Sequence, residues 1–156
     1  MRLSELLSEE RVTVRLAAPT KEVALDAMAS LLAQGQERLE VGLPAIVRVL
    51  RDREALASTG VGDEVAIPHG RLPGLPRLVA ALALCPEGVD FDSIDRRPVR
   101  LFVAILAPER CPGDQLRALA RVSKLLRDGR VRDRLHHAAS AAEVLDIVRE
   151  EEALLG

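Results

Sequence analysis

The chain is poor in aromatic residues and in cysteine. Its 156 residues include no tryptophan, no tyrosine and two phenylalanines, Phe91 and Phe102. This shortage excludes nucleic-acid binding through a row of aromatic side chains that stack on bases. The two cysteines, Cys85 and Cys111, have no C-x-x-C spacing, and we expect them to be free thiols. Each ends an apolar run, so the two would approach each other if neighbouring strands ended side by side.

The chain also lacks a basic excess and a long apolar run. It has 22 basic and 24 acidic residues, so no net positive charge attracts it to a phosphate backbone. No apolar stretch approaches the ~20 residues that cross a bilayer, and the first five residues do not resemble a secretion signal. We therefore expect a soluble, cytoplasmic protein that neither binds nucleic acid nor inserts into membranes.

The size and the apolar content predict a single domain spanning residues 1–156. A chain of this length that is 48% hydrophobic can fill one core but is too short for two ordinary domains. Two continuous apolar runs, 78–84 and 99–106, are typical of strands buried on both faces. We expect shorter strands at 12–16, at 65–67 and near Phe91.

Helical periodicity and capping residues predict helices around these strands. Thr20 is expected to cap a helix from 21 to about 34, Pro44 lies in the first turn of a second helix, and Ser140 caps the last one. A further helix follows Pro108. The predicted fold is α/β, with a mixed central sheet flanked by helices.

The segment around His69 carries the clearest chemical signal. Pro68 holds Ile67 in an extended conformation, which delivers His69 at the exit of a strand. We expect Gly70 to adopt a positive φ and to turn the chain, leaving room for a partner to approach. A hydrogen bond from one ring nitrogen to a carbonyl would select the tautomer and leave the other nitrogen as a nucleophile. Alternatively, Pro-His-Gly is an ordinary exit from a strand into a turn.

A histidine that carries a phosphoryl group needs hydrogen-bond donors for the phosphoryl oxygens. The segment before His69 is rich in hydroxyl groups and glycine and follows an arginine. The candidate donors are Arg53, Ser58, Thr59 and the N–H groups around Gly60 and Gly62. This set requires neither a metal nor a cofactor.

Several short motifs together resemble one protein family. In chain order they are Arg53-Glu54, Ser58-Thr59-Gly60-Val61-Gly62, Ala66-Ile67-Pro68-His69-Gly70, and Phe91-Asp92-Ser93-Ile94-Asp95 followed by Pro98-Val99. Over nearly the whole chain the sequence resembles an enzyme IIA domain of the phosphoenolpyruvate phosphotransferase system, of the fructose/mannitol/nitrogen-regulatory type. The resemblance implies that His69 accepts a phosphoryl group from a phosphohistidine carrier similar to HPr. Transfer would run from protein to protein, so we leave open whether to class the chain as an enzyme.

The sequence departs from this family at one position. Members commonly have a second histidine at the start of the helix after the last long strand, and here Gln115 occupies that place. An amide donates a hydrogen bond but cannot become charged, so phosphorylation should be weakened rather than prevented. If the alignment is shifted by a few residues, Arg110 or Arg117 supplies the cation instead.

Two other groups of residues have simpler interpretations. His136 and His137 are adjacent and lack companion ligands, so we expect surface residues near a helix end and no metal. Arginines 127, 130, 132 and 134 are expected to form a solvated face, or one that receives an acidic partner.

Three functions remain open from the sequence. The first is a regulatory phosphocarrier of the nitrogen-regulatory branch, whose phosphorylation state is read by target proteins. The second is a sugar-uptake component that passes phosphate to an enzyme IIB for fructose or mannitol. The third is a degenerate binding module that no longer accepts phosphate.

Overall fold

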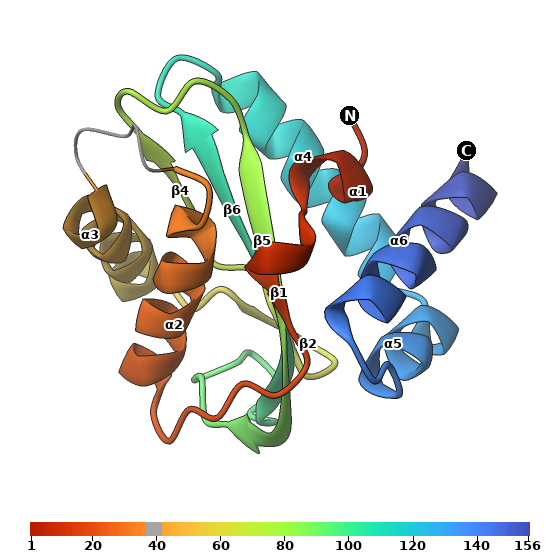
Figure 1. Cartoon of the computed structure of the whole chain (residues 1–156). Helices are drawn as coiled ribbons and strands as arrows, with labels where there is room; N and C mark the ends of the chain where they lie inside the picture. Colours follow the sequence, from red (N-terminus) through yellow and green to blue (C-terminus); the bar gives the residue numbers. More distant parts are fainter. Residues whose placement is uncertain (37–41) are drawn as a thin grey trace.

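The fold is a mixed β-sheet covered by helices on both faces (Figure 1). It is seen in a computed structural model, which describes residues 1–36 and 42–156. The described strands are β1 (Val12–Thr13), β2 (Gly60–Gly62), β3 (Val65–Ala66), β4 (His69–Leu72), β5 (Val79–Val89) and β6 (Val99–Pro108). They are arranged in the order β1-β5-β6-β3-β2, and β4 also pairs with β6. The predicted fold class is confirmed.

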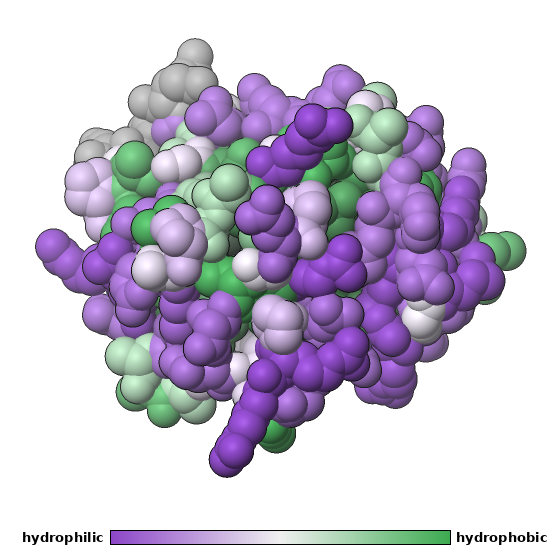
Figure 2. Space-filling view, turned by 90° about the horizontal axis from the view of Figure 1, so that it is seen from below, coloured by the Kyte–Doolittle hydropathy of each residue, from purple (hydrophilic) through white to green (hydrophobic). Residues whose placement is uncertain are grey.

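The helices form two layers. The described helices are α1 (Leu3–Leu6), the short 3₁₀ helix η1 (Glu9–Arg11), α2 (Lys21–Ala33), α3 (Gly42–Leu56), α4 (Pro112–Leu126), α5 (Gly129–His136) and α6 (Ala141–Leu155). Figure 1 shows α2 and α3 on one face of the sheet, and α4, α5 and α6 on the other. Seen from below, the surface is mostly hydrophilic, with smaller apolar areas between the polar side chains (Figure 2).

The two long strands separate two hydrophobic clusters. β5 and β6 are antiparallel, with Leu82 opposite Val103 and Ala83 opposite Phe102. Because side chains alternate along a strand, the first pair packs under α4 and α6 and the second under α2 and α3. Burial on both faces explains why these strands read as continuous apolar runs.

The predicted helix starts are confirmed by their caps. The Thr20 hydroxyl accepts the N–H of Val23 at 3.2 Å, and the Ser140 hydroxyl accepts that of Glu143 at 3.1 Å. Each side chain satisfies an N–H group that has no partner within its helix.

One local prediction was wrong, and one helix was missed. No strand forms near Phe91, because Asp92 and Arg96 adopt positive φ values of 54° and 61°, which are incompatible with an extended chain. Phe91 is instead fully buried in a loop, with its ring at an edge-on contact to Phe102, 5.3 Å between centroids. Helix α5 was not predicted, although Asp128 caps it through the N–H of Arg130 at 2.9 Å.

The two cysteines do not approach each other, so the condition under which they would have met is not fulfilled. Because β5 and β6 run antiparallel, Cys85 lies beside the start of β6, whereas Cys111 follows its far end. Both thiols are free, as predicted. Within residues 1–36 and 42–156, no helix has both the length and the apolar character that a bilayer crossing requires.

Candidate functional site

His69 follows a short break between the strands β3 and β4. β3 and β4 both pair in parallel with β6, and His69, the first residue of β4, lies opposite Ile105. Ile67 and Pro68, the two residues between these strands, form main-chain hydrogen bonds to two different neighbouring segments. The N–H of Ile67 donates to the carbonyl of Thr59 at 2.9 Å, and the carbonyl of Pro68 accepts the N–H of Ile105 at 2.9 Å.

The imidazole of His69 is fixed by a hydrogen bond to the main chain. Its Nδ1 lies 2.8 Å from the carbonyl oxygen of Ile67. A carbonyl oxygen only accepts hydrogen bonds, so Nδ1 carries the hydrogen. In the neutral ring, Nε2 therefore keeps its lone pair and is the nucleophilic atom.

The surroundings of His69 favour this neutral form. Burial lowers the pKa of His69 below its ordinary value of 6.5, and the charge of Arg53 lowers it further. The hydrogen bond to Ile67 and the charge of Glu54 act in the opposite direction without cancelling the shift. Burial therefore favours the neutral imidazole, the form that a nucleophile requires.

The role predicted for Gly70 needs correction. Gly70 does not adopt a positive φ, and the chain does not turn there but continues as strand β4. Its missing side chain serves packing instead, since a Cβ at this position would lie 2.1 Å from Cγ1 of Val49 on α3. Glycine therefore lets helix α3 approach the strand beside His69.

An open hollow surrounds His69 at the meeting point of three elements. It is bounded by the last two turns of α3, by β4 and by the first turn of α4. The hollow is lined by Val49, Asp52, Arg53, Leu56, His69, Gly70, Arg71, Glu109 and Gln115. Four of the residues predicted to form the site are thus brought together: Arg53, His69, Gly70 and Gln115.

Gln115 contacts the strand that carries His69. Its side-chain Nε2 donates to the carbonyl of Gly70 at 2.8 Å. It lies in the first turn of α4, where its own N–H already donates to the carbonyl of Cys111 at 3.2 Å, so the helix start can offer only the N–H groups of Gly113 and Asp114. The two alternatives, Arg110 and Arg117, are not among the residues that line the hollow, and Arg117 pairs with Asp114.

Arg53 lies in the last turn of α3, at the rim of the hollow. Its Nη1 donates to the carbonyl of Ala57 at 2.8 Å, which holds the side chain at the C-terminal end of its own helix. A guanidinium has five N–H donors, so one such bond is compatible with further contacts to an anion.

The hydroxyl- and glycine-rich segment mainly holds its own loop. The Ser58 hydroxyl donates to the carbonyl of Phe91 at 2.8 Å and accepts the N–H of Gly60 at 3.1 Å. The hydroxyl and the N–H of Thr59 both donate to the buried carboxylate of Glu54. Gly60 is packed against Ser93, whose Oγ would lie 2.2 Å from an added Cβ. Phosphoryl binding by these residues stays a prediction.

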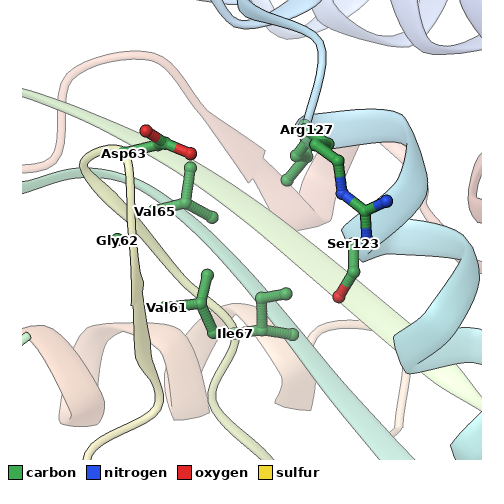
Figure 3. Close-up of a pocket in the computed structure, with 8 residues that line it drawn as sticks. Val61, Gly62, Asp63, Val65, Ile67, Ser123 and Arg127 are labelled. Atoms are coloured by element: carbon green, nitrogen blue, oxygen red, sulfur yellow. The ribbon is translucent and has the colours of Figure 1, made fainter. Parts of the chain in front are cut away.

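Gly62 lines a different pocket from the one around His69. Figure 3 shows this pocket between the β2–β3 hairpin, which contributes Val61, Gly62, Asp63, Val65 and Ile67, and the end of α4, which contributes Ser123 and Arg127. Gly62 has a φ of +96°, so a glycine is favoured there by the backbone itself. A role for Gly62 in phosphoryl binding likewise stays a prediction.

Several residues of the hollow were missed by the sequence reasoning. Val49, Asp52 and Leu56 follow the spacing i, i+3 and i+7, which places them on one face of α3 together with Arg53. Arg71 lies two residues after His69 and shares its side of the strand. No sequence motif pointed to Glu109, because only the parallel pairing of β4 with β6 brings it to the hollow.

The arginine run is only partly solvated, because Arg127 and Arg130 are exposed whereas Arg132 and Arg134 are half-buried. Arg130 and Arg134 of α5 both hold Glu151 of α6, whose side chain is buried, with distances of 2.6 and 2.8 Å. The two neighbouring histidines lie at the end of α5, where His137 is exposed and His136 is half-buried. In the described parts of the chain, no three histidine, cysteine or acidic residues are grouped so as to hold a metal ion.

Comparisons with known proteins agree on one family. A sequence profile of the phosphoenolpyruvate-dependent sugar phosphotransferase system, EIIA 2, matches residues 5–151. A nitrogen regulatory protein of Bradyrhizobium diazoefficiens is 35% identical over 150 residues, which cover 95% of each chain.

Solved structures show the same relationship. The nitrogen regulatory protein IIA-Ntr of Neisseria meningitidis superposes with a TM-score of 0.86 at 29% identity, covering 94% of this chain and 98% of that one. The mannitol enzyme IIA of Escherichia coli, solved in complex with phosphorylated enzyme IIB, has a TM-score of 0.74 at 27% identity, covering 92% and 97%. The chain therefore belongs to the EIIA 2 family of the phosphoenolpyruvate-dependent sugar phosphotransferase system.

Proposed function

We propose that His69 is the phosphoryl acceptor of a regulatory IIA phosphocarrier, and that its donor is a phosphohistidine carrier similar to HPr. The observation that carries this proposal is the hydrogen bond from Nδ1 to the carbonyl of Ile67, which leaves Nε2 as the nucleophile. The lowered pKa of His69 supports the same role, because a protonated ring has no lone pair to offer.

The transfer is an exchange between two imidazoles. The lone pair of His69 Nε2 attacks phosphorus in line, a new P–N bond forms, and the P–N bond to the donor ring breaks with its electrons returning to that ring. The reverse sequence passes the group to an acceptor. No proton needs to leave Nε2, since that atom is already unprotonated.

The groups around the hollow fit a phosphoryl group on His69. Arg53 supplies a charged donor, and the first turn of α4 supplies main-chain N–H groups and the positive end of a helix dipole. We assign Gln115 the place of a neutral donor beside them. Ser58, Thr59, Gly60 and Gly62 stay in the proposed set as the segment before His69, although they are not among the residues that line the hollow. Gly70 keeps α3 close.

The phosphoryl group would also act as the signal. It adds about −1.5 to −2 charges at pH 7 to a hollow whose rim carries both acidic and basic side chains. Leu56 and Leu116, 82% and 69% exposed, border this region and offer apolar contacts for a docking partner. We propose that regulated target proteins recognise the phosphorylation state of His69. We also propose a cytoplasmic location, where the phosphoryl donor would be found.

Phosphorylation with purified components tests the site. The protein is incubated with phosphoenolpyruvate, enzyme I and an HPr-like carrier, and its mass is measured. We expect one acid-labile phosphoryl group on the wild type and none on His69→Ala. A wild type that stays unmodified would contradict the proposal and favour a binding module without phosphotransfer.

A sugar-uptake role is the second candidate. It is motivated by the similar mannitol IIA of Escherichia coli, whose structure includes a phosphorylated enzyme IIB. The phosphorylated protein is mixed with fructose- or mannitol-specific IIB, and the loss of its phosphoryl group is followed over time. Rapid loss to a IIB would support sugar uptake, whereas a retained group supports the regulatory role.

A further inference from the structure

The buried carboxylate of Glu54 anchors the loop that precedes His69. Glu54 follows Arg53 on α3, and its side chain is 4% exposed. Its two oxygens accept the N–H of Thr59 at 2.8 and 3.1 Å, and Oε1 also accepts the Thr59 hydroxyl. The loop is thus held by three contacts to one carboxylate.

A lysine from the neighbouring helix balances the charge of Glu54. Nζ of Lys21, in the first turn of α2, lies 2.8 Å from Glu54 Oε2 and 5.0 Å from the centre of the Phe91 ring. A buried carboxylate is tolerated when it is paired and hydrogen-bonded in this way. Figure 1 shows α2 and α3 side by side, which explains how residues 33 positions apart meet.

From Thr59 a short series of hydrogen bonds leads to the imidazole. The carbonyl of Thr59 accepts the N–H of Ile67 at 2.9 Å, and the carbonyl of Ile67 accepts Nδ1–H of His69 at 2.8 Å. Ile67 lies between β3 and β4, outside the registers in which these strands pair with β6. Its position therefore depends on Thr59 more than that of a residue within a strand would.

We propose that Glu54 is a positioning residue for His69. By fixing Thr59 it keeps the carbonyl of Ile67 where it binds Nδ1–H, and so it maintains the single tautomer in which Nε2 is free to react. Glu54 acts without touching the phosphoryl group. The consequence for phosphoryl transfer rests on the function proposed above, whereas the tautomer is a property of the unphosphorylated protein.

The chain contains a matched control for this proposal. Glu152 is also buried, 1% exposed, and accepts two main-chain N–H groups, those of Leu3 at 2.6 Å and Ser4 at 2.9 Å. Its cation is Arg121, with Nε at 3.5 Å. Glu152 lies on α6, on the other face of the sheet, so it shares the chemistry of Glu54 but not its path to His69.

The experiment compares Glu54→Gln with Glu152→Gln. Nitrogen-15 NMR of the histidine rings at pH 8 distinguishes the protonated from the unprotonated nitrogen of His69. We expect one tautomer, with Nδ1–H, in the wild type and in Glu152→Gln, and a mixture of both tautomers in Glu54→Gln. Phosphoryl transfer from the carrier should fall about tenfold in Glu54→Gln alone, a change of about 1.4 kcal/mol in activation free energy.

Two results would overturn the proposal: a single tautomer in Glu54→Gln, or a mixture in both variants, which would indicate general loosening of the fold. If Glu54→Gln does not fold, Thr59→Val decides by the same tautomer criterion, since it removes the hydroxyl contact and keeps the main-chain one. A wild type that shows one tautomer but accepts no phosphate would refute the proposed function and leave the positioning role standing.

Discussion

At the scale of single residues, the two neighbours of His69 act on its chemistry in different ways. The carbonyl of Pro68 accepts the N–H of Ile105, and the pairing of β3 ends before it, so that His69 begins a new strand. Gly70 allows α3 to approach that strand. The histidine is therefore presented by packing and main-chain hydrogen bonds rather than by a flexible turn.

Replacing Gly70 tests this packing role. In Gly70→Ala the new Cβ would clash with Cγ1 of Val49 at 2.1 Å, so α3 or the Val49 side chain must shift. We expect the free energy of unfolding to fall by about 1–3 kcal/mol, the usual cost of overpacking, as measured by urea denaturation.

Two matched variants make the Gly70 experiment specific. The added mutation Val49→Ala should restore part of the lost stability by removing the methyl group that clashes. Gly113→Ala, whose Cβ would meet no described atom closer than 3.7 Å outside its own helix backbone, should be neutral or stabilising by about 0.5–1 kcal/mol. An equal loss in both glycine variants would contradict the packing argument.

The amide of Gln115 makes a second prediction at this scale. Gln115→Ala removes the hydrogen bond to the carbonyl of Gly70, which is worth about 0.5–1.5 kcal/mol. We expect slower phosphoryl transfer and a shorter phosphohistidine lifetime in rapid-quench assays. Gln115→His should lengthen that lifetime, because a protonated imidazole forms a stronger, charge-assisted bond. If neither variant changes transfer or lifetime, Gln115 is not part of the site.

At the scale of elements, α5 is attached to α6 through one buried acid. Glu151 of α6 receives Arg130 and Arg134, which lie one helical turn apart on α5. Hydrogen bonds from these two guanidinium groups lower the pKa of Glu151 to about 2. The arginine run therefore has a structural explanation, which its charge alone did not reveal.

Glu151→Gln tests this attachment. At pH 7 it should reduce the free energy of unfolding by about 1.5–3 kcal/mol, the range for hydrogen bonds to charged groups. The folded pKa of about 2 is below the unfolded value of ~4.3, so this stabilisation is complete above pH ~4.3 and is lost as the pH falls toward 2. Between pH ~4.3 and 2, the free energy of unfolding of Glu151→Gln should therefore change less with pH than that of the wild type.

An exposed neighbour provides the control for Glu151. Among the residues that the structure describes, Glu150 pairs with Arg134 alone, and its side chain is 61% exposed. Glu150→Gln should therefore change stability by less than about 1 kcal/mol, as for surface ion pairs. Equal effects of the two substitutions, in urea denaturation at pH 7, would argue against a special role for Glu151.

At the scale of the whole molecule, the hollow lies where the two helical layers meet. α3 belongs to one layer and α4 to the other, and β4 lies between them (Figure 1). A group bound to His69 can thus contact elements from both faces of the sheet. This arrangement suits a phosphocarrier of the phosphotransferase system, in which a small chemical change must be recognised by other proteins.

The sequence allowed much of this architecture to be predicted. The apolar runs of β5 and β6, the caps Thr20 and Ser140, and the motif around His69 are local signals. The remaining features depend on contacts between distant residues. Lys21 lies 33 positions from Glu54, and Arg130 lies 21 positions from Glu151. The approach of Val49 to Gly70 likewise depends on how α3 packs. No pattern within one segment reports such contacts.

The central claim is that Nδ1 of His69 is occupied by the main chain and that Nε2 accepts the phosphoryl group. The most direct test is to phosphorylate nitrogen-15-labelled protein with the carrier system and to locate the P–N bond by phosphorus–nitrogen NMR coupling. The account predicts a single phosphoryl group on Nε2 of His69. A phosphoryl group on Nδ1 of His69, or on His136 or His137, would contradict it.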